Sequence, residues 1–291
     1  MSPLNVLEIV APPFLVIFLG YLYNLIKKTN TDLLVQFAMK VLVPAFAFYH
    51  FLRMEIDPSL LGQVFMSAWI IMLGSGLVGF FIFRMLSIKV RGLYLPIMFM
   101  NTINLPFPIL LSAYGDRAIF FSLSFYLASL IGIFTIGILL VTGKNESHRV
   151  FREPIIYALI AAFYFKYTGT LPPELVTKTC GLLQNATIPI ILLALGMQLS
   201  MTTLSHLKTS IIASVCRMGG GLIIGIACVK GFHLEGLAGK VVLFNAMMPS
   251  AMISYIVAHK FSSEGPLVAS TILVSTLISL ATIPLALILL G

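Results

Sequence analysis

Two short stretches combine residues that fit poorly inside an apolar helix with residues that can bind an anion. They read Asn-Thr-Ile-Asn-Leu-Pro-Phe-Pro at positions 101–108 and Asn-Ala-Met-Met-Pro-Ser-Ala at positions 245–251. Proline removes a backbone donor and clashes with the preceding turn, so each stretch predicts a broken helix. The break frees backbone N–H groups, and asparagine amides are further donors for a carboxylate. We therefore expect the two stretches to face each other and to hold a small organic anion.

The candidate substrate-binding residues come from these stretches and from one cation inside another apolar run. Arg217 is that cation: it either attracts the anion or binds backbone carbonyls and fixes its own helix. For the asparagines the alternative is a proline kink at which they only bond neighbouring helices. Met248 offers an adaptable apolar wall or serves as ordinary core. The predicted substrate-binding set is Asn101, Thr102, Asn104, Pro106, Pro108, Arg217, Asn245, Met248, Pro249 and Ser250.

The composition is that of an all-α polytopic membrane protein. Of 291 residues, 59% are hydrophobic and only 10% are charged, against about 25% charged residues in soluble domains. Long apolar runs favour helices of about 20 residues over the alternating strands of a barrel. The net charge of +8 is explained by Lys and Arg at cytoplasmic helix ends, so no nucleic-acid partner is predicted.

Ten transmembrane spans are expected, and the fourth and ninth contain the two broken stretches. Lys40 should reach the interface, and His50 and His259 should be solvated at span ends rather than act in a proton relay. The loops that carry more Lys and Arg are inside when both termini are outside. The expected spans are 6–26, 33–52, 62–86, 92–114, 118–141, 154–165, 181–199, 207–229, 237–258 and 267–290.

The two halves of the chain echo each other. Pro44 and Pro189 are 145 residues apart, and Asn101 and Asn245 are 144 residues apart. A repeat of five spans enters the membrane from opposite sides, so the halves are predicted to be inverted. The division is residues 1–142 for the first repeat, 143–153 for a cytoplasmic linker and 154–291 for the second repeat.

No enzyme constellation, cofactor or metal site is predicted. The chain has no H-E-x-x-H, G-x-S-x-G or Walker sequence. Spans 3–5 and 8–10 have no Asp or Glu away from their ends, which argues against proton coupling through a buried carboxylate. Coupling to a sodium ion held by hydroxyls and freed carbonyls remains an open alternative.

The residues resemble those of the auxin efflux carrier family along nearly the whole chain. Residues 101–108 are similar to its N-T-G-N-x-G-x-P signature, residues 245–251 to its second crossover, which ends in M-P-x-A, and residues 189–196 to its P-x-x-L-x-x-L-G segment. Arg217 falls where the family tends to place Arg. Ile103 and Pro106 depart from it, because the family commonly has Gly there.

The resemblance implies ten helices as two inverted five-helix repeats, with helices 4 and 9 crossing at their breaks. It implies a scaffold of spans 1, 2, 6 and 7, a possible homodimer through spans 2 and 7, and a mobile transport part of spans 3–5 and 8–10. The expected function is elevator-type secondary transport of a mono- or dicarboxylate by a compact protein of the bacterial inner membrane. The alternatives are a sodium-coupled symporter of bile-acid type and a non-transporting membrane sensor.

Overall fold

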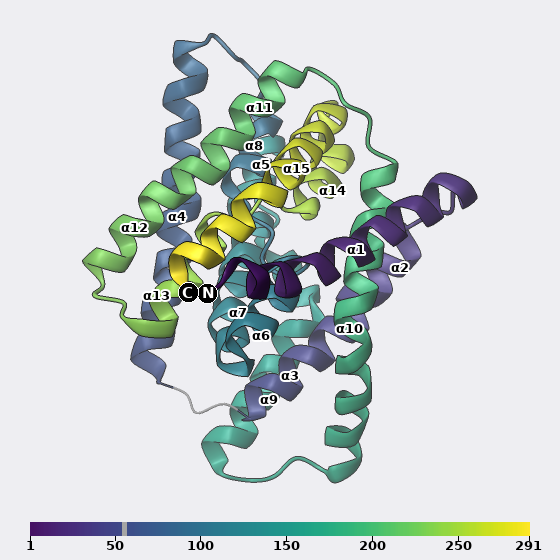
Figure 1. Ribbon diagram of the computed structural model, residues 1–291, viewed down its shortest axis with the longest axis vertical. Coiled ribbons are helices and arrows are strands. Elements are labelled where there is room, and N and C mark those ends of the chain that lie inside the picture. The colour runs from purple at the N-terminus through teal and green to yellow at the C-terminus, as the bar shows by residue number, and fades with distance from the viewer. Residues whose placement is uncertain (54–56) are drawn as a thin grey trace.

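The computed structural model describes residues 1–53 and 57–291, and these residues form helices joined by loops (Figure 1). One isolated β-bridge is the sole extended pairing in the described residues. The prediction of an all-α protein is therefore confirmed.

Seven helical segments are long and apolar enough to cross a membrane, and they coincide with predicted spans 1, 2, 3, 5, 7, 8 and 10. Three of the segments contain a π-helical turn. The seven are α1 (Pro3–Lys27), α2 (Asp32–Phe37) with η1 (Ala38–Leu42) and α3 (Val43–Arg53), α4 (Pro58–Met85), α7 (Asp116–Gly132) with η3 (Ile133–Gly137) and α8 (Ile138–Thr142), α10 (Glu174–Ser200), α11 (Leu207–Val215) with η5 (Cys216–Gly220) and α12 (Gly221–Gly231), and α15 (Gly265–Leu290).

The remaining three predicted spans are shorter or interrupted. Residues 99–105 are not helical, and we call them the first unwound segment; residues 247–251 are the second unwound segment. The helices concerned are α9 (Pro154–Thr168) in span 6, η2 (Arg91–Leu93), α5 (Tyr94–Met98) and α6 (Pro106–Tyr114) in span 4, and α13 (Gly236–Ala246) and α14 (Met252–Phe261) in span 9, while η4 (Ser147–Arg152) lies in the linker.

Pro106 and Pro108 do not lie where the first helix is broken, whereas Pro249 lies in the second unwound segment. Pro106 and Pro108 open α6, because proline is tolerated in a first helical turn, whose N–H groups have no partner within the helix. Asn245 lies in the last turn of α13, one residue before that helix ends. The first break, residues 99–105, is therefore shifted by two to three residues from the predicted stretch 101–108, and the second, residues 247–251, lies within the predicted stretch 245–251.

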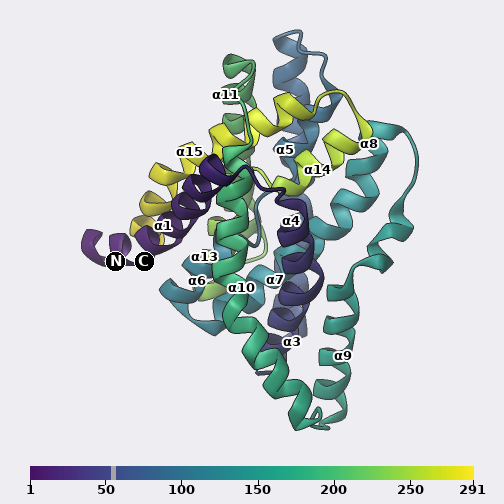
Figure 2. The ribbon, with the colours of Figure 1, turned by 90° about the vertical axis from the view of Figure 1, so that its right-hand side faces the viewer.

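The helices pack in two groups. The first helix group comprises α1, α2, η1, α3, α9 and α10, in which α1 packs on α10 and α3 packs on both α9 and α10 (Figure 2). The second helix group comprises α4 to α8 and α11 to α15, in which α4 packs on α7 and α12, and α15 packs on α11 and α14. The linker residues 143–153 join the groups.

Two glycines allow α1 and α10 to approach closely. A Cβ atom at Gly196 would overlap the carbonyl oxygen of Ile17, and one at Gly20 would overlap that of Leu193. The buried Asn24 side chain fixes the contact by donating to the carbonyl of Met197 at 3.2 Å. Small residues at helix interfaces are how apolar helices gain packing energy within a bilayer.

The five loops predicted to be cytoplasmic gather at one end of the molecule, which we call the basic end. The loop after α1 contacts the loop after α10 through Thr31 and Met201. Ser205 of the latter loop contacts the start of α15, and Glu264, just before α15, accepts from the backbone of Gly92. The linker joins them because Arg149 lies over the Phe261 ring.

Replacement of Gly196 by alanine should destabilise the protein, because the added methyl group pushes α10 away from α1. We expect a loss of about 1–3 kcal/mol of unfolding free energy, the usual cost of overpacking. Thermal unfolding in detergent measures it. Gly62→Ala is the matched control, since a Cβ at Gly62 meets nothing within 4 Å; equal melting temperatures for the two variants would contradict the close-packing account.

Candidate functional site

The two unwound segments lie side by side and pair through their backbones. Met100 and Ser250 form an antiparallel bridge. The Asn101 N–H donates to the carbonyl of Pro249 at 2.7 Å, and the Ala251 N–H donates to that of Phe99 at 2.8 Å. Backbone that leaves a helix at membrane depth must find partners within the protein, and here each segment supplies them to the other.

Ser250 ties this pairing to two further helices. Its N–H donates to the hydroxyl of Ser275 on α15 at 3.1 Å, and its own hydroxyl donates to the carbonyl of Pro96 on α5 at 2.7 Å. Its side chain is buried, and its hydroxyl proton is donated within the protein. Ser250 therefore positions the second unwound segment.

Arg217 joins the carboxyl ends of the two helices that precede the unwound segments. Its guanidinium donates to the carbonyls of Ile97 and Met98 of α5 at 3.1 Å each and to that of Ala246 of α13 at 2.9 Å. The last carbonyls of a helix lack helical partners and carry its negative partial charge. Gly221 leaves the room for this, because a Cβ there would overlap the guanidinium. The sequence left two roles open for Arg217, attraction of the anion or binding of backbone carbonyls. The structure shows the contacts with backbone carbonyls.

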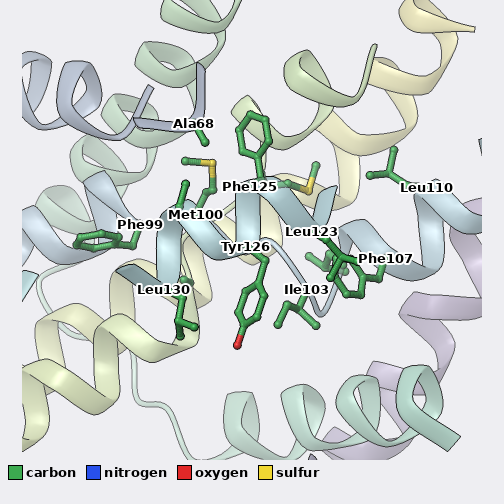
Figure 3. Close-up of a cluster of buried hydrophobic side chains, with 14 of the residues drawn as sticks. Ala68, Phe99, Met100, Ile103, Phe107, Leu110, Leu123, Phe125, Tyr126 and Leu130 are labelled. Carbon is green, nitrogen blue, oxygen red and sulfur yellow. The ribbon is translucent and has the colours of Figure 1, made fainter. Parts of the chain in front are cut away.

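A cavity of about 290 Å³ lies between the two helix groups. Residues of α2, η1 and α10 line it from the first group, and the first unwound segment, α7 and the start of α14 line it from the second. Figure 3 shows three of its lining side chains, Ile103, Tyr126 and Leu130, extending to the same side. Its polar and charged lining residues are Gln36, Lys40, Asn101, Thr102, Asn104, Tyr126, Ser129, Arg149, Glu153, Gln198 and Lys260.

The amino ends of two helices meet at this cavity. Asn104 precedes α6 by two residues, and Met252 and Ile253 open α14; all three line the cavity. The Asn101 carboxamide oxygen accepts from the Asn104 N–H at 3.0 Å, which shapes the first unwound segment into a turn. Helix amino ends carry positive partial charge. At α6 this charge acts without free N–H groups, because Pro106 and Pro108 have none and the Phe107 N–H donates to the carbonyl of Ile103 at 3.1 Å. The arrangement favours a negatively charged ligand.

Cations outnumber carboxylates where the cavity meets the linker. The lining includes Lys40, Arg149 and Lys260 but a single carboxylate, Glu153. That carboxylate is paired with Lys40 at 2.8 Å. Arg149 donates to Glu146, outside the lining, at 2.9 Å, and this hydrogen bond holds the pKa of the Glu146 carboxyl below its usual value. With these two ion pairs formed, Lys260 leaves the rim of the cavity with a net positive charge.

The structure brings three of the ten predicted site residues to the cavity, namely Asn101, Thr102 and Asn104. Asn245 is buried elsewhere, where it donates to the carbonyl of Val241 at 3.0 Å and accepts from Ser122 at 3.3 Å. Sequence spacing gives the depth of a residue along a helix but not the direction of its side chain. The other predicted residues lie outside the cavity lining: Pro106, Pro108, Arg217, Met248, Pro249 and Ser250.

Sequence reasoning missed the contribution of α7 and α10 to the cavity. Tyr126 and Ser129 are three residues apart on α7, and Gln198 is near the end of α10. A polar pair at helical spacing on an apolar helix is a weak signal, so these residues could not be singled out. Within residues 1–53 and 57–291, no group of three or more His, Cys, Asp or Glu side chains could hold a metal ion.

Comparison with known proteins finds transporters. Residues 148–287 match a family described as "Membrane transport protein". The chain is 25% identical over 303 residues to an uncharacterized transporter of Methanocaldococcus jannaschii, with 98% of both chains covered. It is 28% identical over 209 residues to an uncharacterized transporter of Methanothermobacter thermautotrophicus, with 68% of this chain and 67% of that relative covered.

Removal of the Arg217 guanidinium should destabilise the pairing of the unwound segments, because three carbonyls lose their charged donor. We expect Arg217→Gln to lower the unfolding free energy by about 3 kcal/mol or more, since each hydrogen bond to a charged group contributes roughly 1.5–3 kcal/mol. Thermal unfolding in detergent or nanodiscs measures this. Arg84→Gln, at an exposed arginine of α4, is the control, and a variant Arg217→Gln as stable as Arg84→Gln would refute the assigned role.

Proposed function

We propose that the chain, whose residues 148–287 match a family described as "Membrane transport protein", is a secondary carrier for a small organic anion. The observation that carries the proposal is the cavity at which the amino ends of α6 and α14 meet beside Asn101, Thr102 and Asn104. A carboxylate there would accept hydrogen bonds from the side-chain amides and lie near two positive helix ends.

The charge of the cavity supports an anionic substrate over a cationic one. Its only lining carboxylate among the described residues, Glu153, is neutralised by Lys40. Lys260 adds positive charge at the rim, where Arg149 is paired with Glu146. Charges of one sign around a cleft raise the local concentration of the oppositely charged ligand. The rim would therefore attract the anion and the helix ends would bind it.

The walls of the cavity favour a monocarboxylate with an apolar body over a small dicarboxylate. Phe134, Ile191, Leu195 and Ile256 are among the apolar side chains that line it. Its volume of about 290 Å³ lies near the lower end of the roughly 300–1,000 Å³ typical of ligand pockets. A branched aliphatic or aromatic carboxylate would bury its body against these walls and present its carboxylate to Asn101.

An elevator-type movement would carry this substrate across the membrane. We propose ten passes, made of the seven long helices, α9 and the two interrupted helices, and arranged as inverted repeats 1–142 and 154–291. The hydrogen bond from Thr187 to the carbonyl of Leu42, 145 residues away, supports pseudo-symmetry because the offset equals that of Pro44 and Pro189. The second helix group would slide against the first, which is the proposed scaffold and candidate dimer interface.

In the proposed orientation both termini lie outside the cell membrane and the basic end faces the cytoplasm. The basic loops then obey the bias of Lys and Arg toward the inside. The cavity, whose rim includes Arg149 of the linker and Lys260, would be open to the cytoplasm. The described state would be the inward-facing one.

Removal of the Asn101 amide should weaken anion binding without unfolding the protein. We expect Asn101→Ala to reduce the affinity for a transported carboxylate by about tenfold or more, the value of a hydrogen bond to a charged group. Counterflow in proteoliposomes, screened over radiolabelled aliphatic, aromatic and dicarboxylic acids with and without sodium, measures substrate and affinity. Asn5→Ala, at an exposed position of α1, is the control. Absence of flux for every acid would refute the carrier. Wild-type kinetics in Asn101→Ala would show that the substrate does not bind at Asn101.

Neutralising the rim should slow anion capture in a salt-dependent way. We expect the double variant Arg149→Gln, Lys260→Gln to raise the substrate concentration at half-maximal flux severalfold at low salt, because rim charges act mainly on association. At about 1 M salt the screening length falls to ~3 Å, so the difference from wild type should largely vanish. Lys230→Gln, a basic residue absent from the cavity lining, should change neither value. A defect that persists at high salt would contradict electrostatic attraction.

A further inference from the structure

A separate polar cluster lies at the other end of α3 from the cavity. The His50 side chain is only 6% exposed, with Nδ1 at 3.3 Å from Asp116 Oδ1 and Nε2 at 3.3 Å from Gln184 Oε1. Lys40 of the cavity is ten residues earlier, about 15 Å along the helix axis. The prediction of a solvated His50 is wrong, because the Phe46 ring covers it with centroids 4.2 Å apart.

Both ring nitrogens of His50 face oxygen acceptors. The orientation of the Gln184 amide follows from its second contact, since its Nε2 donates to Asn185 Oδ1 at 2.5 Å. Rotating the Gln184 amide alone by a half-turn would place its Oε1 against Asn185 Oδ1, and two acceptors cannot hydrogen-bond to each other. A neutral imidazole has one N–H donor, whereas the protonated ring has two. The cluster is therefore complementary to the protonated form of His50.

The charges around His50 come from two elements. Asp116 from α7 is the carboxylate, and its side chain is 58% exposed, so protons from solvent can reach the pair. On α3 itself, Arg53 is one turn further along and lies over the Tyr49 ring, 3.8 Å from its centroid. α10 presents the uncharged Gln184, and α9 presents aromatic rings to this part of α3. Asp116 is thus the one anionic partner of His50 among the described residues.

We propose that His50 is a proton-binding site that couples the relative position of the two helix groups to pH at the end opposite the basic loops. His50 and Gln184 belong to the first helix group, and Asp116 begins α7 of the second. If the second group moves, the carboxylate leaves the ring, so His50 binds a proton more tightly in the docked state described here. By linkage, protons favour the docked state by the same factor. The inference rests on the proposed carrier function, because it requires the groups to move.

Single-molecule energy transfer between dyes on the two groups tests the proposal without a substrate. Thr170→Cys, after α9, and Glu235→Cys, before α13, are exposed positions on the first and second group, in a chain whose Cys180, Cys216 and Cys228 are replaced and which is held in nanodiscs. Lowering the pH from about 8 to about 5.5 should raise the ratio of docked to undocked molecules up to about tenfold. This is the low end of the factor by which a nearby opposite charge changes proton affinity, because the Asp116 side chain is 58% exposed.

His50→Gln and Asp116→Asn should each abolish this response, and the second variant leaves the buried ring untouched. His259→Gln, at an exposed ring stacked on Tyr255, should respond like wild type. Two populations whose ratio ignores pH, or a wild-type response in Asp116→Asn, would overturn the proton site and leave the carrier proposal standing. A single distance at every pH would overturn both.

Discussion

The structure depends on satisfying backbone groups where two helices unwind in an apolar environment. A buried amide without a partner costs several kcal/mol, and the chain meets this demand in two ways. Residues 99–101 and 249–251 hydrogen-bond to each other, and Arg217 supplies N–H donors to the carbonyls that end α5 and α13. Neither device works alone, because the bridge leaves the helix ends unpaired and the guanidinium does not reach the strand-like residues. Each interruption therefore supplies hydrogen-bond partners that the other needs.

This arrangement separates the negative ends of the four half-helices α5, α6, α13 and α14 from the positive ends. The negative carboxyl ends of α5 and α13 face Arg217, whose charge is fixed and buried, while the amino ends of α6 and α14 face the cavity. A ligand in the cavity meets the positive ends with the opposing negative ends already neutralised. Because helix-end potentials fall off within about one turn, this separation is what would make the cavity selective for an anion. In the proposed carrier, Arg217 would thus support anion binding without touching the ligand.

Sequence alone predicted the helical class and the approximate positions of both interruptions, because hydropathy and proline restrict every local conformation. It misjudged the directions of side chains. Asn101 and Asn245 are similar in sequence context, yet the first lines the cavity and the second bonds within α13. Which face of a helix meets a cavity is decided by packing between elements far apart in the chain. The same reason explains why Tyr126 was missed and why His50 was expected in solvent.

The interface between the two helix groups is polar at its ends and apolar between them. At one end it has the electropositive rim, and at the other the pair of His50 and Asp116. Between them the Phe46 ring of α3 stacks on that of Phe107 at 5.2 Å, and next to His50 the Phe51 ring lies 5.4 Å from that of Phe120. Apolar contacts are non-directional, so sliding one surface over the other exchanges similar contacts at little cost. In the proposed carrier, directional polar contacts at the two ends would then define the stopping points of the movement.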